Sequence, residues 1–136
     1  MIGIINKEHN IPLHVVLFKG DHIHLYYFMD QMIKYLENTG IDYYIAEADN
    51  PYTYQCSEFD IFISKPGCVM FTFNNVGVWL RSDQGNIWAL KGIRVYTFIQ
   101  DHPRNYSDCL LEPECDITAL CLDRNHIDFI KSITER

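Results

Sequence analysis

The chain has few positive charges, and this scarcity limits the partners that it can bind. Its 136 residues include 11 Lys and Arg against 18 Asp and Glu, which gives a formal net charge of −7, and the basic residues form no cluster. Binding to a phosphate backbone requires several neutralising cations on one face of a protein. We therefore expect neither nucleic acid nor an anionic membrane surface as a partner.

Long apolar runs and a cysteine framework are also missing. No apolar stretch approaches the ~20 residues that span a bilayer, and residues 1–9 lack the basic region and long apolar core of a secretory signal. The five cysteines are odd in number, irregularly spaced and without a Cys-x-x-Cys pair, so neither a disulfide framework nor a structural zinc site is expected. These absences predict a protein of the reducing cytoplasm with no membrane span.

The glycine-rich signatures of several enzyme classes do not occur. The sequence contains no Gly-x-Gly-x-x-Gly, no Gly-x-x-x-x-Gly-Lys-[Ser/Thr] and no Gly-x-Ser-x-Gly. This disfavours a small enzyme of the flavodoxin-like or hydrolase type, and we expect no cofactor. A receiver-type domain is disfavoured because no acidic pair follows the first apolar run before Gly20.

The residues that are present favour one α/β domain. The composition, 48% hydrophobic and 14% aromatic, suits a chain with a substantial core. Apolar runs without alternation predict strands that are buried on both faces. These runs are His14–Phe18, Asp42–Ala46, Cys68–Phe73, Arg94–Ile99 and Ile117–Leu122.

Between these runs the period of the apolar residues changes. Steps of three and four residues from Leu25 to Leu36 predict a helix over 22–38, with Asp21 as its N-cap and Gly40 at its end. A closing helix after Asp123 carries Ile127, Ile130 and Ile133, and 106–111 is expected to be briefly helical. The alternation predicts a three-layer Rossmann-like fold over 1–136, with a mostly parallel sheet and helices on both faces.

Two stretches allow more than one interpretation. Phe59–Ser64 is strand-like and lies too close to Cys68–Phe73 for a helical crossover, so the two either pair as a hairpin or one is a minor element. Val76–Leu90 predicts either a broken helix or a loop followed by a short helix, because Gly77 and Gly85 interrupt it.

Polar side chains follow the predicted strands where each one ends. The most informative stretch is Asp101-His102-Pro103, after the strand Arg94–Ile99. In a parallel sheet such residues lie at the carboxyl edge, where ligands bind, although Asp101-His102-Pro103 could equally begin a turn or cap a short helix. Further candidates for ligand contacts at this edge are Gly20, Asp21, His22, Asn74, Asn75 and Asp123.

Each of these candidates also has a structural interpretation. Gly20 would allow an anion to approach a helix N-terminus, but a simple turn explains it better. Asp123 suits an N-cap better than a ligand contact. No metal is expected at His22-x-His24, because residues two apart on a helix point in different directions. Trp79 and Trp88 fit either the core or a platform for a sugar ring.

Three stretches together resemble a known family. They are Phe71–Gly77, Gly92–Val95 running into Asp101-His102-Pro103, and Ile117–His126. The chain resembles, from about Leu13 to its end, the N-terminal domain of uncharacterised bacterial glycosyltransferase-like proteins with two Rossmann-like halves.

The resemblance implies an acceptor-side role. In such proteins the N-terminal half holds the acceptor, the C-terminal half holds the nucleotide sugar, and catalysis occurs between them. Asp101 or His102 would then be the general base, and Asn74 and Asn75 would contact acceptor or donor. Because the sequence ends after one half, we expect it to be inactive alone, to need a C-terminal Rossmann-like domain in cis or in trans, and to self-associate. The alternative is a stand-alone, non-catalytic α/β binding or interaction module.

Overall fold

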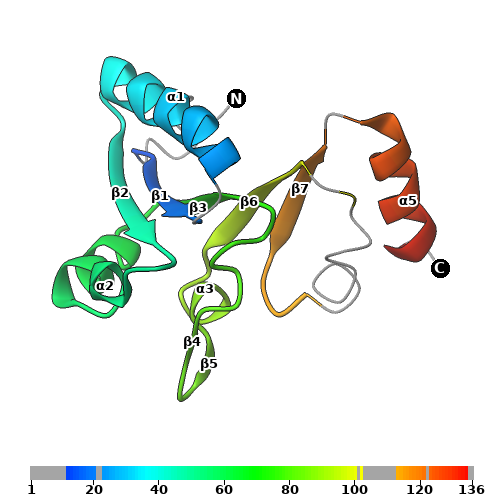
Figure 1. Ribbon diagram of the computed structural model, residues 1–136. Helices are drawn as coiled ribbons and strands as arrows, with labels where there is room; N and C mark the ends of the chain where they lie inside the picture. The colour runs from blue at the N-terminus through cyan, green and yellow to red at the C-terminus, as the bar shows by residue number, and fades with distance from the viewer. Residues whose placement is uncertain (1–11, 21–22, 101, 103–112, 122, 135–136) are drawn as a thin grey trace.

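The described residues form an α/β domain around one parallel sheet. The computed structural model describes residues 12–20, 23–100, 102, 113–121 and 123–134. The sheet contains β1 (His14–Lys19), β2 (Asp42–Glu47), β3 (Cys68–Phe73), β6 (Arg94–Ile99) and β7 (Ile117–Cys121), in the order β2-β1-β3-β6-β7 (Figure 1). Every neighbouring pair is parallel. The predicted Rossmann-like fold with a mostly parallel sheet is confirmed.

The strand order defines a switch point between β1 and β3. From β1 the chain first moves outward to β2, and it then returns to place β3, β6 and β7 on the opposite side of β1. This is the order of flavodoxin-like doubly wound sheets, whose ligands bind outside the carboxyl ends of the strands at that reversal.

Helices cover both faces of the sheet. On one face α1 (Ile23–Thr39) packs Leu25, Met29 and Leu36 against alternate residues of β1 and β3. On the other face α2 (Ser57–Ile63) and α3 (Ile87–Leu90) enclose a second apolar cluster, with the short 3-10 helix η1 (Pro51–Thr53) before them. The sequence spacing of the α1 residues explains this packing, since positions four and seven apart share one side of a helix.

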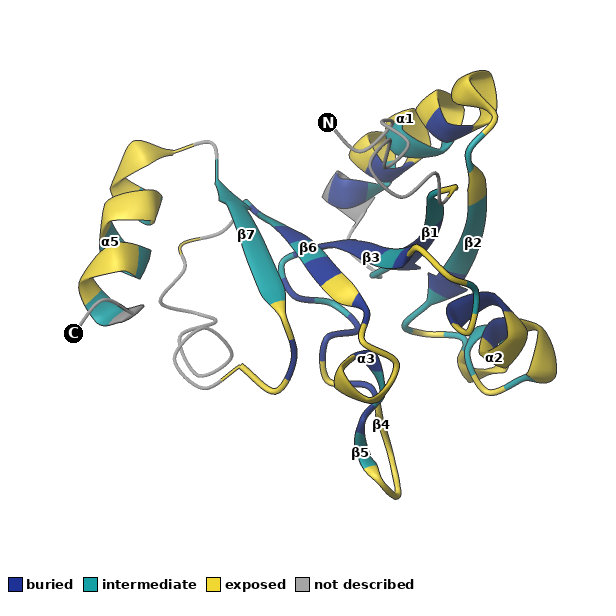
Figure 2. Cartoon of the chain, turned by 180° about the vertical axis from the view of Figure 1, so that it is seen from behind, coloured by how far each residue is buried: buried dark blue, intermediate teal, exposed yellow. Residues whose placement is uncertain are grey.

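The C-terminal helix of the described structure is the most exposed to solvent of the long helices. α5 (Arg124–Thr134) lies beside β7 at the edge of the sheet, and none of its described side chains is buried (Figure 2). Among the described residues, no helix combines the length and the apolar character that crossing a membrane would require.

The strand predicted over Phe59–Ser64 is wrong, because residues 59–63 belong to α2 and Ser64 caps its C-terminus. Phe59, Phe62 and Ile63 are buried, whereas Ile61 is 66% exposed. Burial at steps of three and four follows the helical period, and the apolar alternation of the sequence imitated a strand. Of the two alternatives left open for this stretch, a hairpin with Cys68–Phe73 is therefore wrong, since β3 pairs with β1 and β6.

Of the two interpretations of Val76–Leu90, the loop followed by a short helix is confirmed. A hairpin that the sequence did not predict, β4 (Arg81–Ser82) with β5 (Gly85–Asn86), precedes α3. Asn86 begins α3, because its side-chain Oδ1 accepts hydrogen bonds from the amides of Trp88 and Ala89. The helical segment expected over 106–111 lies outside the described residues.

Two predicted helix ends agree with the structure. Gly40 has a φ of 71° directly after α1, the left-handed conformation that favours glycine at this position. Asp123 precedes α5, and its Oδ1 accepts a hydrogen bond of 2.8 Å from the amide of Asn125. Asp21, the cap predicted for the start of α1, lies outside the described residues.

Candidate functional site at the carboxyl edge

The predicted site residues come from the ends of different strands. Because β1, β3, β6 and β7 are parallel, the residues that follow them meet at one edge of the sheet. The structure describes Gly20, Asn74, Asn75, His102 and Asp123 at this edge. The other predicted residues, Asp101, Asp21 and His22, lie outside the described residues.

The ends of β1 and β3 are in close contact at the switch point. A Cβ atom added to Gly20 would lie 3.1 Å from Cγ2 of Val76, and one added to Gly77 would overlap the ring of Phe18. The hydroxyl of Thr72 also donates to the carbonyl oxygen of Phe18 at 3.0 Å. Gly20 therefore has a packing role, because any side chain there would press on the turn after β3.

Asn74 and Asn75 form a tight turn at the end of β3. Their φ angles are 50° and 61°, and the amide of Val76 donates to the carbonyl of Phe73 at 3.1 Å. Two successive left-handed residues define a type I′ turn, which favours asparagine. The predicted ligand residues are thus placed by a turn that reverses the chain at the carboxyl edge.

Hydrogen bonds connect this turn to the end of β6. The side-chain Oδ1 of Asn74 accepts from the amide of Gln100 at 2.8 Å, and the Asn74 amide donates to the carbonyl of Phe98 at 3.0 Å. The amide of Asn75 donates to the hydroxyl of the fully buried Thr97 at 2.9 Å. The Asn74 side chain is therefore hydrogen-bonded to Gln100, which lies two residues before His102.

The side-chain amide of Asn75 is the most unusual group at the edge. The residue is only 6% exposed, and neither Oδ1 nor Nδ2 has a hydrogen-bond partner in the described structure. Leaving such a group unpaired costs roughly 1–3 kcal/mol, so it calls for an explanation. Both atoms are buried, so a hydroxyl or amide of a ligand could pair with them only if the atoms that cover them moved.

His102 is exposed and lies against α5. The centroid of its ring is 4.9 Å from that of His126 and 5.0 Å from that of Phe129, both in edge-on contacts. Nε2 of His126 is 3.9 Å from Oδ2 of Asp123. The structure thus brings His102 and Asp123 into one group around His126, a residue whose role the sequence analysis missed.

A cation also lies at this edge. Lys19 ends β1, and its Nζ is 4.5 Å from the centroid of the Tyr26 ring on α1. The sequence analysis named the three residues that follow Lys19 but not this contact, which depends on how α1 crosses the sheet. Within the described ranges, no group of three His, Cys, Asp or Glu side chains could hold a metal ion.

Cys68 and Cys121 do not suit nucleophilic chemistry. Burial raises the pKa of the Cys68 thiol to about 12 and also raises the pKa of Cys121. Both thiols therefore stay protonated near neutral pH and behave as small apolar residues.

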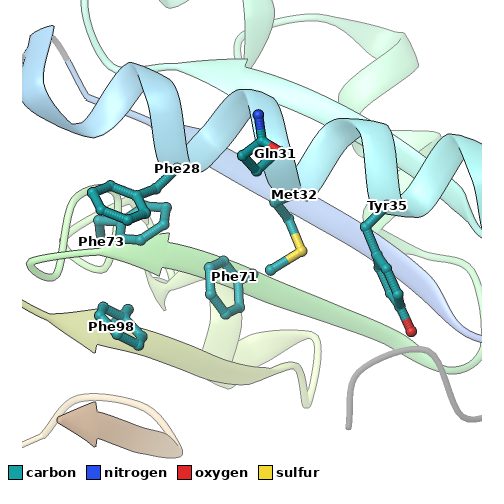
Figure 3. A pocket seen from close by; sticks show the side chains of 7 residues that line it. All are labelled: Phe28, Gln31, Met32, Tyr35, Phe71, Phe73 and Phe98. Atoms are coloured by element: carbon teal, nitrogen blue, oxygen red, sulfur yellow. The ribbon is translucent and has the colours of Figure 1, made fainter. Parts of the chain in front are cut away.

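A second feature is an apolar groove of about 420 Å³ between α1 and the sheet (Figure 3). It starts at the carboxyl ends of β3 and β6 and follows α1. Its walls are mostly aromatic, and the polar groups among the lining side chains are the amide of Gln31 and the hydroxyl of Tyr35. The lining residues are Phe28, Gln31, Met32 and Tyr35 of α1, Phe71 and Phe73 of β3, and Phe98 of β6. Its volume falls within the range of small-molecule pockets.

The fold and the edge together define the class of the protein. The chain is a Rossmann-like α/β domain with a doubly wound parallel sheet and a polar carboxyl edge at its switch point. Comparison with protein-family models, with curated proteins and with solved structures finds no match.

Proposed function

We propose that the chain is the acceptor-side, N-terminal domain of a bacterial glycosyltransferase-like protein. Its reaction would transfer a sugar from a nucleotide-sugar donor to a hydroxyl group of the acceptor. The observation that carries the proposal is the unpaired side-chain amide of Asn75, buried at the carboxyl edge beside the switch point. A buried polar group that weakens the fold is expected where a ligand uses it. The resemblance of the flanking segments to the family specifies the reaction.

The transfer requires a general base for the acceptor hydroxyl and a face of the site that the donor can reach. The acceptor oxygen bonds to the anomeric carbon of the donor while the bond from that carbon to the nucleotide phosphate breaks. Asp101 or His102 takes the hydroxyl proton. The exposed imidazole of His102 suits this role, since the donor arrives from a second domain that faces this edge. The isolated chain holds no donor and should not turn over.

The test uses a protein that contains both halves. Asp101→Asn and His102→Ala are compared with the wild type by release of nucleoside diphosphate from a panel of nucleotide sugars. We expect the variant that removes the base to lose about 10²–10⁴-fold in kcat, the usual contribution of a general base. Asp83→Asn, in the exposed β4–β5 hairpin, is the matched control and should keep full activity. Full activity in both variants would exclude either residue as the base.

The second candidate is a stand-alone, non-catalytic module that binds a small apolar ligand. The apolar groove favours it, because the groove is formed within this chain alone and needs no second domain. Met32→Glu would place a charge among the groove's aromatic residues. It should abolish binding of an apolar fluorescent probe if the groove is a ligand site, while leaving transfer by the two-domain protein unchanged.

A further inference from the structure

The two tryptophans of the chain have opposite environments. Trp88 is fully buried, and its Nε1 donates to the carbonyl of Gly77 at 2.8 Å. Trp79 is 52% exposed, although its neighbours Val78 and Leu80 are both buried. Tryptophan is usually well buried in folded proteins. An indole exposed between two core residues is therefore not explained by packing.

Trp79 lies at the carboxyl edge, in contact with the ends of other strands. Its ring centroid is 6.1 Å from that of Phe18, the penultimate residue of β1, and 6.2 Å from that of Tyr54, which follows η1 in the segment after β2. Trp79 itself follows β3. A ring from β1 and rings from the segments that follow β2 and β3 thus meet near the switch point, where doubly wound sheets bind ligands.

The loop that carries Trp79 is held in place by hydrogen bonds. Nδ2 of Asn86 donates to the carbonyl of Val78 at 2.8 Å, and the amide of Leu80 donates to the carbonyl of Gly77 at 3.2 Å. The rings of Phe18 and Tyr54 meet the indole at 74° and 79°. Edge-on contacts of this kind hold the ring while half of it stays open, so the indole is positioned before any ligand binds.

We infer that Trp79 is the platform on which a pyranose ring of the acceptor stacks. A pyranose presents C–H groups on its face, and these are attracted to the negative face of an aromatic ring. A rigid, flat and half-exposed indole at the ligand edge matches that surface. The inference rests on the proposed function, because the acceptor-side role is what makes a sugar the expected ligand.

The chain itself provides the probe for a test. Trp79 and Trp88 are its two tryptophans, and Trp88 has no exposed surface. Acrylamide quenching of indole fluorescence therefore reports on Trp79. The full chain is applied to a microarray of pyranose oligosaccharides, and each bound glycan is then titrated in solution with fluorescence as the readout. We expect binding to protect Trp79 from acrylamide.

Three variants test whether glycan binding depends on the Trp79 ring. Trp79→Ala should weaken glycan binding at least about tenfold, as expected for loss of an aromatic contact together with its buried area. Trp79→Phe, which keeps a smaller ring, should retain part of the affinity. Tyr27→Ala removes an aromatic side chain that is 65% exposed on α1, and it should bind like the wild type.

The outcomes separate this inference from the proposed function. Glycan binding that Trp79→Ala leaves unchanged would overturn the platform and leave the acceptor-side role standing. If the wild type binds no glycan, the Trp79 platform and the acceptor-side role are both overturned. Protection of Trp79 that rises with protein concentration in the absence of glycan would assign the indole to self-association, and it would also overturn the inference.

Discussion

Asn74 and Asn75 have the same backbone conformation but opposite hydrogen bonding. Both are left-handed, yet the Asn74 side chain accepts from the backbone amide of Gln100, while the side-chain amide of Asn75 is buried without a partner. The sequence alone cannot distinguish the two, because the partner comes from a strand 26 residues away. This difference separates a structural asparagine from a candidate functional one.

Replacing each asparagine with glycine should therefore have opposite effects on stability. Glycine accepts the left-handed conformation at either position. Asn75→Gly also removes an unpaired amide, so we expect the free energy of unfolding to rise by roughly 1 kcal/mol. Asn74→Gly loses an accepted bond and should lower it by roughly 1 kcal/mol. Urea titration of both variants measures the difference, and a loss of stability in Asn75→Gly would make that residue structural.

Two glycines with left-handed backbones provide a second comparison of substitutions at positions that share a backbone conformation. Gly40 and Gly77 have φ angles of 71° and 82°, but an added Cβ meets no atom within 4 Å at Gly40 and overlaps Phe18 at Gly77. Gly40→Ala should cost about 1–2 kcal/mol, the price of the left-handed conformation alone. Gly77→Ala should cost about 1–3 kcal/mol more, because it also overpacks the core. Equal thermal shifts would contradict the close packing of β1 against the 74–77 turn.

At the scale of elements, α2 shows where sequence patterns are ambiguous. The run Phe59-Asp60-Ile61-Phe62-Ile63 fits alternation and helical spacing about equally well in so short a stretch. Tertiary packing decides between them, because α2 covers the face of the sheet on which Phe59 and Phe62 join the core. The longer pattern of α1 was predicted correctly, since its repeat extends over several turns.

Substitutions in α2 distinguish its helix from the strand that the sequence suggested. Phe62→Ala should lower the free energy of unfolding by about 3–5 kcal/mol, because the ring is 6% exposed in the core. Ile61→Ala should change it by no more than about 0.5 kcal/mol, since Ile61 is 66% exposed. A strand would reverse this order. Chemical denaturation of the two variants measures their free energies of unfolding and so distinguishes the helix from the strand.

An ion-pair network links β1, β2 and the end of α2, and it predicts a pH effect. Oδ2 of Asp42 lies 2.8 Å from Nζ of Lys65 and 2.9 Å from Nδ1 of His14. The hydrogen bond from Lys65, followed by that from His14, holds the pKa of Asp42 below its ordinary value of 3.8. A lowered carboxyl pKa stabilises the fold above that value, and this contribution is lost as pH falls through the folded-state pKa.

Asp42→Asn should therefore be slightly less stable than the wild type at pH 7, and the difference should disappear as the pH falls below 3.8. The effect should be small, because the carboxylate is about half exposed and screened by solvent. Thermal melts across this range measure it. A difference that persists at the lowest pH would assign the effect of the substitution to packing.

At the scale of the whole molecule, the carboxyl edge and the groove make different predictions about size. A domain that supplies one side of a catalytic cleft works as part of a larger protein, whereas a module with its own groove can work alone. The first measurement is the mass of the native protein in an extract of its source cells, detected with an antibody against this domain.

We expect a band two to three times larger than the 16.0 kDa chain if the domain is half of an enzyme. Recombinant chain in the same gel is the size control. A band at 16.0 kDa would favour the stand-alone module or a partner domain that acts in trans. Glycan binding and the search for partners would then come before any transfer assay.

The sequence by itself determined the fold class, the strands of the parallel sheet and the edge at which their polar residues collect. It could do so because buried parallel strands are continuous apolar runs, and because strand ends are marked by glycine, asparagine and acids. Only the tertiary structure decided that residues 57–63 form a helix, that His126 lies against His102, that the side-chain amide of Asn75 is unpaired and that Trp79 is exposed. Each of these depends on contacts between residues from different elements, and such contacts leave no local pattern in the chain.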